Sequence, residues 1–157
     1  MNEAVTKRFL LYFRLMLLGW ILIANAFFHV IEFDYSWLVF LSNIMLFTME
    51  GDIKDRFLSV ELGGLVGMVL TVLAMLAIAA LTPVLGGLPG LLLPLAVVLF
   101  LLIILHPYAP KVLNNVGFAY LTVACIDAET FAANLPRFFF LYIVGSLVFN
   151  GVCILLM

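Results

Sequence analysis

Charged residues are scarce in this sequence of 157 residues. Seven Lys or Arg and nine Asp or Glu make up 10% of the chain, with a formal net charge of −2, whereas hydrophobic residues make up 67%. Soluble globular domains carry about 25% charged and about 45–50% apolar residues. Such a chain cannot cover its surface with polar groups, so lipid must be the solvent for much of it. The lack of any basic patch or run also argues against a nucleic-acid partner.

Motifs for several common chemistries are also missing. The sequence contains no Gly-x-x-x-x-Gly-Lys-[Ser/Thr], no His-Glu-x-x-His and no Cys-x-x-Cys. Its two cysteines, Cys125 and Cys153, lie in apolar runs, which argues against a disulfide framework. His29 and Glu32 are interpreted as interfacial polar residues rather than metal ligands. We therefore expect no cofactor, no metal and no ATP-driven pump or soluble-type hydrolase. An enzyme embedded in the membrane is a weaker hypothesis than either a transporter or a scaffold.

Long apolar runs, separated by short polar segments, fill most of the chain. A membrane-spanning helix needs roughly 20 apolar residues. Long runs cover about 9–28, 57–81, 91–105 and 136–157, and shorter ones cover 35–49 and 111–126. We predict a single domain, 1–157, that is an all-α membrane protein of about six transmembrane helices, with helices two and five short. Thr82-Pro83 is expected to end helix three, and residues 85–90 to form a turn. Whether the short runs span the membrane or turn back is left open.

The basic residues predict an orientation. With six spans and a cytoplasmic N-terminus, one side collects Lys7, Arg8, Lys54, Arg56 and Lys111. Only Arg137 falls on the other side. This bias is the positive-inside pattern, and it predicts that both termini are cytoplasmic.

The two halves of the chain, about 9–82 and 88–157, resemble each other. Arg56-Phe57 is followed by Gly64 eight positions after the arginine, and Arg137-Phe138 is followed by Gly145 at the same spacing. An acidic segment precedes each arginine, although a loop insertion is needed to align them. Chance similarity between apolar segments is the competing explanation.

A repeat of three helices would be inverted in the membrane, because an odd number of spans reverses the second copy. Inverted repeats are typical of transporters, with the solute pathway between the halves near the midplane. A matching pair of unusually short apolar segments is the best sequence indicator of that pathway. The runs 35–49 and 111–126 are such a pair.

Polar residues near these segments are the candidates for a pathway. Arg56 and Arg137 stand at helix starts, where free N–H groups and the helix dipole favour anions; each arginine could instead pair with a nearby acid, Arg56 with Asp52 and Arg137 with Asp127 or Glu129. The acidic residues Glu50, Asp52, Asp127 and Glu129 form either solvated turns or charged vestibules.

Asparagines in the apolar runs need polar partners, which lipid does not offer. They are Asn25, Asn43, Asn114, Asn115 and Asn150. The asparagines could either form hydrogen bonds between helices or line a water-filled pathway. The pathway is favoured for those on the two short segments. Gly63-x-x-x-Gly67 predicts close helix packing, either within the chain or between copies.

The stretch Tyr35-Ser-Trp37, the acidic turn after it and Arg56 before a glycine-bearing helix resemble the membrane domain of the fusaric-acid-resistance and aromatic-acid-exporter group. The second half, with residues 114–120 and Leu135-Pro-Arg137, also resembles small bacterial inner-membrane proteins of this layout. The resemblance implies a six-helix unit, often oligomeric, that helps to move small organic anions across the inner membrane. Val60 stands where a glycine is common, which leaves the substrate and the energy coupling open.

We therefore expect a small-solute transporter or channel subunit of the bacterial inner membrane, with small organic anions as the candidate solute and a homo-oligomer as the working form. Its pathway residues would be Asn43, Glu50, Asp52, Arg56, Asn114, Asn115, Asp127, Glu129 and Arg137. The alternative is a non-transporting scaffold or accessory subunit, in which the same glycine faces bind partner helices and the polar residues solvate loops or join helices.

Overall fold

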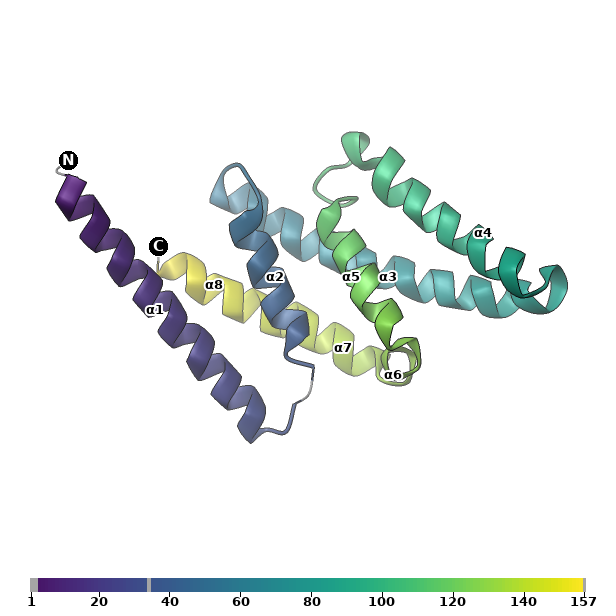
Figure 1. The fold of residues 1–157 in the computed structure, drawn as a ribbon, viewed down its shortest axis with the longest axis horizontal. Coiled ribbons are helices and arrows are strands. Elements are labelled where there is room, and N and C mark those ends of the chain that lie inside the picture. The colour runs from purple at the N-terminus through teal and green to yellow at the C-terminus, as the bar shows by residue number, and fades with distance from the viewer. Residues whose placement is uncertain (1–2, 34, 157) are drawn as a thin grey trace.

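A computed structural model of the protein describes residues 3–33 and 35–156, and the regular secondary structure in these ranges is helical (Figure 1). The α-helices are α1 Glu3–Val30, α2 Trp37–Thr48, α3 Ile53–Leu85, α4 Gly87–Leu99, α5 Asn115–Ile126, α6 Ala128–Ala133, α7 Leu135–Leu141 and α8 Leu147–Leu155. Two π-helical segments, η1 Phe100–Ile104 and η3 Tyr142–Ser146, and the 3₁₀ turn η2 His106–Tyr108 complete the set. Segment η3 joins α7 to α8 in one continuous helix.

Four helices are long and apolar enough to cross a membrane. They are Arg8–Val30, Ile53–Leu85, Gly87–Ile104 and Leu135–Leu155. The chain is therefore a multi-pass membrane protein, as its composition predicts. The two short apolar runs each form one uninterrupted helix of 12 residues, α2 and α5. At 1.5 Å per residue each is about 18 Å long, which is shorter than the hydrocarbon core of about 30 Å.

The predicted end of helix three at Thr82-Pro83 is wrong. Pro83 lies inside α3, which continues to Leu85, and the turn before α4 is Gly86 alone, with φ of +84°. A proline so near the end of a helix removes only one hydrogen bond, and glycine adopts positive φ without steric cost. Pro89 and Gly90, expected in a turn, instead lie in the first turns of α4. A Cβ atom on Gly90 would lie 2.5 Å from Thr82 Cα, so this glycine allows the tight α3–α4 hairpin.

Helix α3 is the centre of the fold, with α4 and α5 packed along it (Figure 1). Its glycine face lies against α5: a Cβ atom on Gly67 would be 2.4 Å from the carbonyl oxygen of Gly117, and one on Gly63 would meet the Asn114 side chain. The Gly63-x-x-x-Gly67 pattern therefore packs helices within the chain.

Two tyrosines join the halves of the chain through backbone carbonyls. Tyr120 Oη of α5 donates to the carbonyl oxygen of Leu38 in α2, and Tyr142 Oη of η3 donates to that of Val60 in α3 over 2.7 Å. Both hydroxyls are buried between helices. By contrast, α1 lies at the edge of the fold beside α8 (Figure 1). Most of its large apolar side chains are exposed.

Candidate functional site: a polar cluster around Glu61

A carboxyl group lies in the middle of the apolar fold. Glu61 belongs to α3, and its side chain contacts Ser146 and Asn150 of the continuous helix Leu135–Leu155. Ser146 is at the middle of this 21-residue helix, and Ser42, which bonds to Ser146, is at the middle of α2. The carboxyl therefore lies beside the middle of the helix Leu135–Leu155, and Glu61 itself stands eight residues after the start of α3. A charge among apolar spanning helices is costly.

The Glu61 cluster comprises Ser42, Glu61, Ser146 and Asn150. Glu61 Oε1 accepts hydrogen bonds from Ser146 Oγ over 2.7 Å and from Asn150 Nδ2 over 3.1 Å. Asn150 Nδ2 also lies 3.0 Å from Ser42 Oγ, whose own hydroxyl donates to the Val39 carbonyl oxygen over 2.7 Å. Ser42, Ser146 and Asn150 are fully buried, whereas Glu61 is partly exposed. The donors of the cluster thus converge on one carboxyl oxygen.

Asn43 sets the direction of this network. Its Nδ2 donates to Asn150 Oδ1 over 3.2 Å and approaches Cys153 Sγ at the same distance. Because the amide oxygen of Asn150 accepts from Asn43, its NH₂ group is the part that faces Glu61 and Ser42. Asn43 is the one predicted pathway residue that lies beside the cluster.

The π-helical segment η3 presents two side chains of the site to α3. Tyr142 opens the segment and Ser146 closes it. Tyr142 Oη donates to the carbonyl oxygens of Val60 and Glu61 over 2.7 and 3.3 Å, in space that Gly64 leaves open. A Cβ atom on Gly64 would lie 2.1 Å from that hydroxyl. Single π-helical turns inside helices frequently mark functional sites.

The second carboxyl oxygen of Glu61 accepts no hydrogen bond from the described residues. The hydrogen bonds that its side chain accepts from the described residues go to Oε1. Among these residues the only buried side-chain nitrogen or oxygen without a partner is Arg56 Nε, so Oε2 reaches the surface of the fold. A negative charge on Oε2 would therefore face the lipid or water outside the helices.

Asn114 and Asn115, predicted in the pathway, lie apart from this cluster. Asn114 is the N-cap of α5: its Oδ1 accepts from Val116 N over 2.9 Å and from Gly117 N over 3.3 Å, and its Nδ2 donates to the Ser59 carbonyl oxygen over 3.0 Å. It therefore ties α5 to α3. Asn115 is exposed.

Arg56 binds the end of a neighbouring helix. Its Nη1 donates to the carbonyl oxygens of Leu46 and Met49, each over 3.3 Å, at the C-terminus of α2. A cation is favoured there because the C-terminal end of a helix carries partial negative charge. The considered pairing with Asp52 is not found among the described ion pairs, and Asp52 instead caps α3 through Lys54 N. Glu50 is exposed.

Arg137 lies above the ring of Phe33, with its Cζ 4.8 Å from the ring centroid. The described ion pairs do not include the considered pairing with Asp127 or Glu129. Asp127 instead caps α6 by accepting from Thr130 N over 3.1 Å, and Glu129 is exposed in the first turn of α6. Thus neither predicted arginine reaches the Glu61 cluster.

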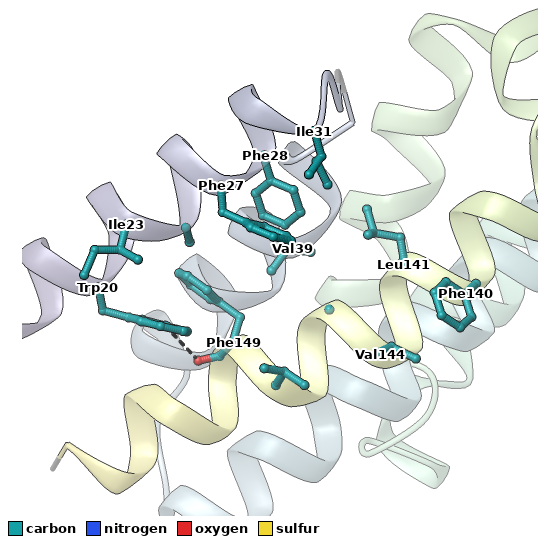
Figure 2. Close-up of a pocket in the computed structure, with 13 residues that line it drawn as sticks. Trp20, Ile23, Phe27, Phe28, Ile31, Val39, Phe140, Leu141, Val144 and Phe149 are labelled. Atoms are coloured by element: carbon teal, nitrogen blue, oxygen red, sulfur yellow. Dashed lines mark hydrogen bonds between the residues drawn. The ribbon is translucent and has the colours of Figure 1, made fainter.

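A groove of ≈ 550 Å³ lies between α1, α2 and the helix Leu135–Leu155. Figure 2 shows that apolar side chains line it, with one hydrogen bond, from Trp20 Nε1 to the Phe149 carbonyl oxygen, at its edge. The Glu61 cluster does not open into this groove. Among the described residues, no group of three His, Cys, Asp or Glu side chains is placed to hold a metal ion.

Sequence reasoning missed Glu61, Ser42 and Ser146, and it recognised Asn150 only as one asparagine among five. A signal for Glu61 was present, since it is a lone carboxylate inside the apolar run 57–81. Serines in apolar helices carry no such signal. Searches against protein families, curated proteins and solved structures find no significant match to this chain, so no family is identified.

Proposed function

We propose that this chain is a small-solute transporter or channel subunit of the bacterial inner membrane, with the Glu61 cluster at the centre of its pathway. The observation that carries the proposal is the carboxyl of Glu61, which lies within a spanning helix and is held by Ser146 and Asn150 of another. Lipid offers a carboxyl group no partner, and ionisable residues inside spanning segments mark solute and ion pathways.

The two halves would be inverted repeats of three helices. Reciprocal contacts support this arrangement: Gly64 faces Tyr120, and Gly145 faces Val39. The shift along the chain that carries Gly64 onto Gly145 also carries Val39 onto Tyr120, so each contact is the exchanged copy of the other. Such an exchange is expected of two halves related by a pseudo-two-fold axis.

The cluster draws side chains from both halves, which supports a pathway between them. Ser42 and Glu61 come from the first half, whereas Ser146 and Asn150 come from the second. Transporter sites of inverted repeats lie near the midplane at such an interface. The exposed acids of the loops would form vestibules, and the uncovered face of α1 would pack against another copy in a homo-oligomer.

Small organic anions remain the candidate solute from the sequence resemblance. An ionised Glu61 would repel an anion, whereas a protonated Glu61 would donate a hydrogen bond to it. The proposal therefore favours anions that pass the cluster while Glu61 is protonated and neutral.

A scaffold or accessory subunit is the second candidate. It is favoured by the pairing of Asn43 and Asn114 with other helices and by the apolar lining of the groove in Figure 2. In that case the polar cluster would hold helices together and nothing would cross.

Solute flux into proteoliposomes tests the proposal. Wild type is compared with Asn150→Ala and with empty liposomes across a panel of small anions, cations and neutral solutes. We expect flux of one class and a loss of at least tenfold in the variant. Thr122→Val is the matched control, because Thr122 is an exposed α5 residue that bonds only within its own helix. Absence of flux from folded protein would contradict transport and favour the scaffold.

A further inference from the structure

We infer that Glu61 is a proton-exchange site among the spanning helices, which binds a proton on Oε2 and releases it again. Binding of the proton stands on the geometry alone; its coupling to solute movement rests on the proposed function. In this step an O–H bond forms at Oε2 with a proton from water, the carboxylate becomes a neutral acid, and the reverse step returns the proton to water.

The hydrogen bonds of the cluster leave one oxygen for the proton. Ser146 Oγ and Asn150 Nδ2 both donate to Oε1, so that oxygen accepts in either protonation state. Oε2 has no hydrogen-bond partner among the described residues and reaches the surface of the fold. The carboxyl can therefore gain or lose a proton without rearrangement of its two donors.

No cation among the described residues balances the charge of an ionised Glu61. The titratable side chains that face it are Tyr120 of α5 and Tyr142 of η3, whereas α2 contributes only Ser42 and Asn43, and Cys153 of α8 contacts Asn43. On its own helix, Arg56 points to the carbonyl oxygens at the end of α2. Charge on Glu61 is thus stabilised by two neutral donors, and a proton is the simplest group that removes it.

A metal cation fits this cluster less well than a proton. Oxygen-binding cations take about six oxygen ligands. The amide oxygen of Asn150 accepts from Asn43 Nδ2, and Ser42 Oγ accepts from Asn150 Nδ2. Besides Oε2, the cluster therefore offers few oxygens with free lone pairs. A sodium ion is the cation that could still compete with a proton for Oε2, so the experiment includes sodium as a separate variable.

Labelling with dicyclohexylcarbodiimide tests proton binding directly, because this apolar reagent enters the membrane and reacts with protonated carboxyl groups. The full chain in phosphatidylcholine–phosphatidylglycerol vesicles is labelled between about pH 5 and pH 9, and the modified residue is located by peptide mass spectrometry. We expect one label on Glu61, at a rate that falls at least tenfold as pH rises. Glu50 and Glu129, both exposed, should stay unlabelled, and Glu61→Gln should remove the label.

Three outcomes would overturn the inference: no label on Glu61 at any pH, a rate that does not change with pH, or a rate that sodium lowers at constant pH. Asn150→Leu adds a second check, made on protein whose folding is verified by thermal unfolding, because loss of a donor to Oε1 favours the neutral acid and should raise labelling at pH 7 about threefold or more. An unchanged or slower rate would contradict the geometry.

Flux measurements separate this inference from the proposed function. pH-dependent labelling in a protein that shows no flux would keep the proton site and reject the transporter. Flux that is unchanged in Glu61→Gln and independent of a pH gradient would keep the transporter and reject the proton site as its coupling group.

Discussion

At the scale of single residues, the polar groups of this protein take two kinds of place. Some, such as Asn114 and Asp127, cap helices and complete the backbone hydrogen bonding of the fold. Others, Glu61 and Asn150 among them, join side chains of different spanning helices. The first kind affects folding only, whereas the second combines helix association with a group that can change its charge.

Asn150 should be the most sensitive neutral residue of the cluster. Asn150→Leu removes the donor to Glu61 and Ser42 and leaves the Asn43 amide with only Cys153 Sγ as acceptor. Since hydrogen bonds between membrane helices contribute about 0.6 kcal/mol on average and about 1.7 kcal/mol at most, we expect a loss of about 1–2 kcal/mol. Thermal unfolding in detergent measures it. Stability equal to that of Thr122→Val would show that the network contributes nothing.

The cap at Asn114 makes a second prediction. Asn114→Ala removes the acceptor for the first N–H groups of α5 and the bond to the Ser59 carbonyl oxygen. Loss of an N-cap lowers the free energy of unfolding by about 0.5–2 kcal/mol. Because Asn114 is buried, we expect a loss toward the upper end of this range. The exposed neighbour gives the control, because Asn115→Ala should leave the unfolding temperature unchanged. Equal effects of the two substitutions would rule out the cap as the cause.

At the scale of the elements, α3 holds the fold together because it lacks side chains where other helices need space. Gly63 and Gly67 allow α5 to approach, and Gly64 admits the Tyr142 hydroxyl. The π-helical segment η3 also packs on α3. Its Tyr142 and Ser146 side chains both form hydrogen bonds with residues of α3. Close approach of backbones in lipid is the means by which small residues drive helix association.

Substitution of one glycine should therefore separate α3 from α5. In Gly67→Ala the new Cβ atom would lie 2.4 Å from the Gly117 carbonyl oxygen, which is backbone and cannot rotate away. We expect a loss of about 1–3 kcal/mol, the usual cost of overpacking, in thermal unfolding. Gly151→Ala is the matched control, because a Cβ atom there meets nothing within 4 Å. If both variants unfold at the same temperature, the two helices do not depend on this contact.

At the scale of the whole molecule, the contacts between loops bear on how many times the chain crosses the membrane. The ion pair between Lys111 Nζ and Asp55 Oδ1, 2.6 Å apart, places the start of α3 and the segment before α5 on one side. This agrees with the grouping of basic residues that the positive-inside pattern predicts. Helices α2 and α5 are short, so they could cross only where the bilayer is thinned or the surrounding helices admit water.

Cysteine labelling decides the number of crossings. In a Cys125→Ser, Cys153→Ala background, Glu50→Cys should resist a membrane-impermeant maleimide added to intact cells, because six crossings place this loop in the cytoplasm. Glu129→Cys, outside in either arrangement, should react and serves as the positive control. Reaction of Glu50→Cys from outside would mean that α2 does not cross, and the chain would then have four spans.

Hydropathy and residue type by themselves determined that this chain is helical, lies in a membrane, and has two short helices between long ones, because these properties depend on local composition. The Gly63-x-x-x-Gly67 pattern likewise predicted a close helix contact. Local signals were less reliable at helix ends: Pro83 is tolerated in the last turn of α3, where few hydrogen bonds remain to be lost.

Only the tertiary structure decided which polar residues meet. Ser42, Glu61, Ser146 and Asn150 come from three helices, and they converge because α2, α3 and the helix Leu135–Leu155 pack against one another. Of the two predicted arginines, Arg56 instead donates to carbonyl oxygens at the end of α2, and Arg137 lies above the ring of Phe33. Hydropathy indicates how deep a residue lies in the membrane, but the rotation and crossing of the helices determine its partners.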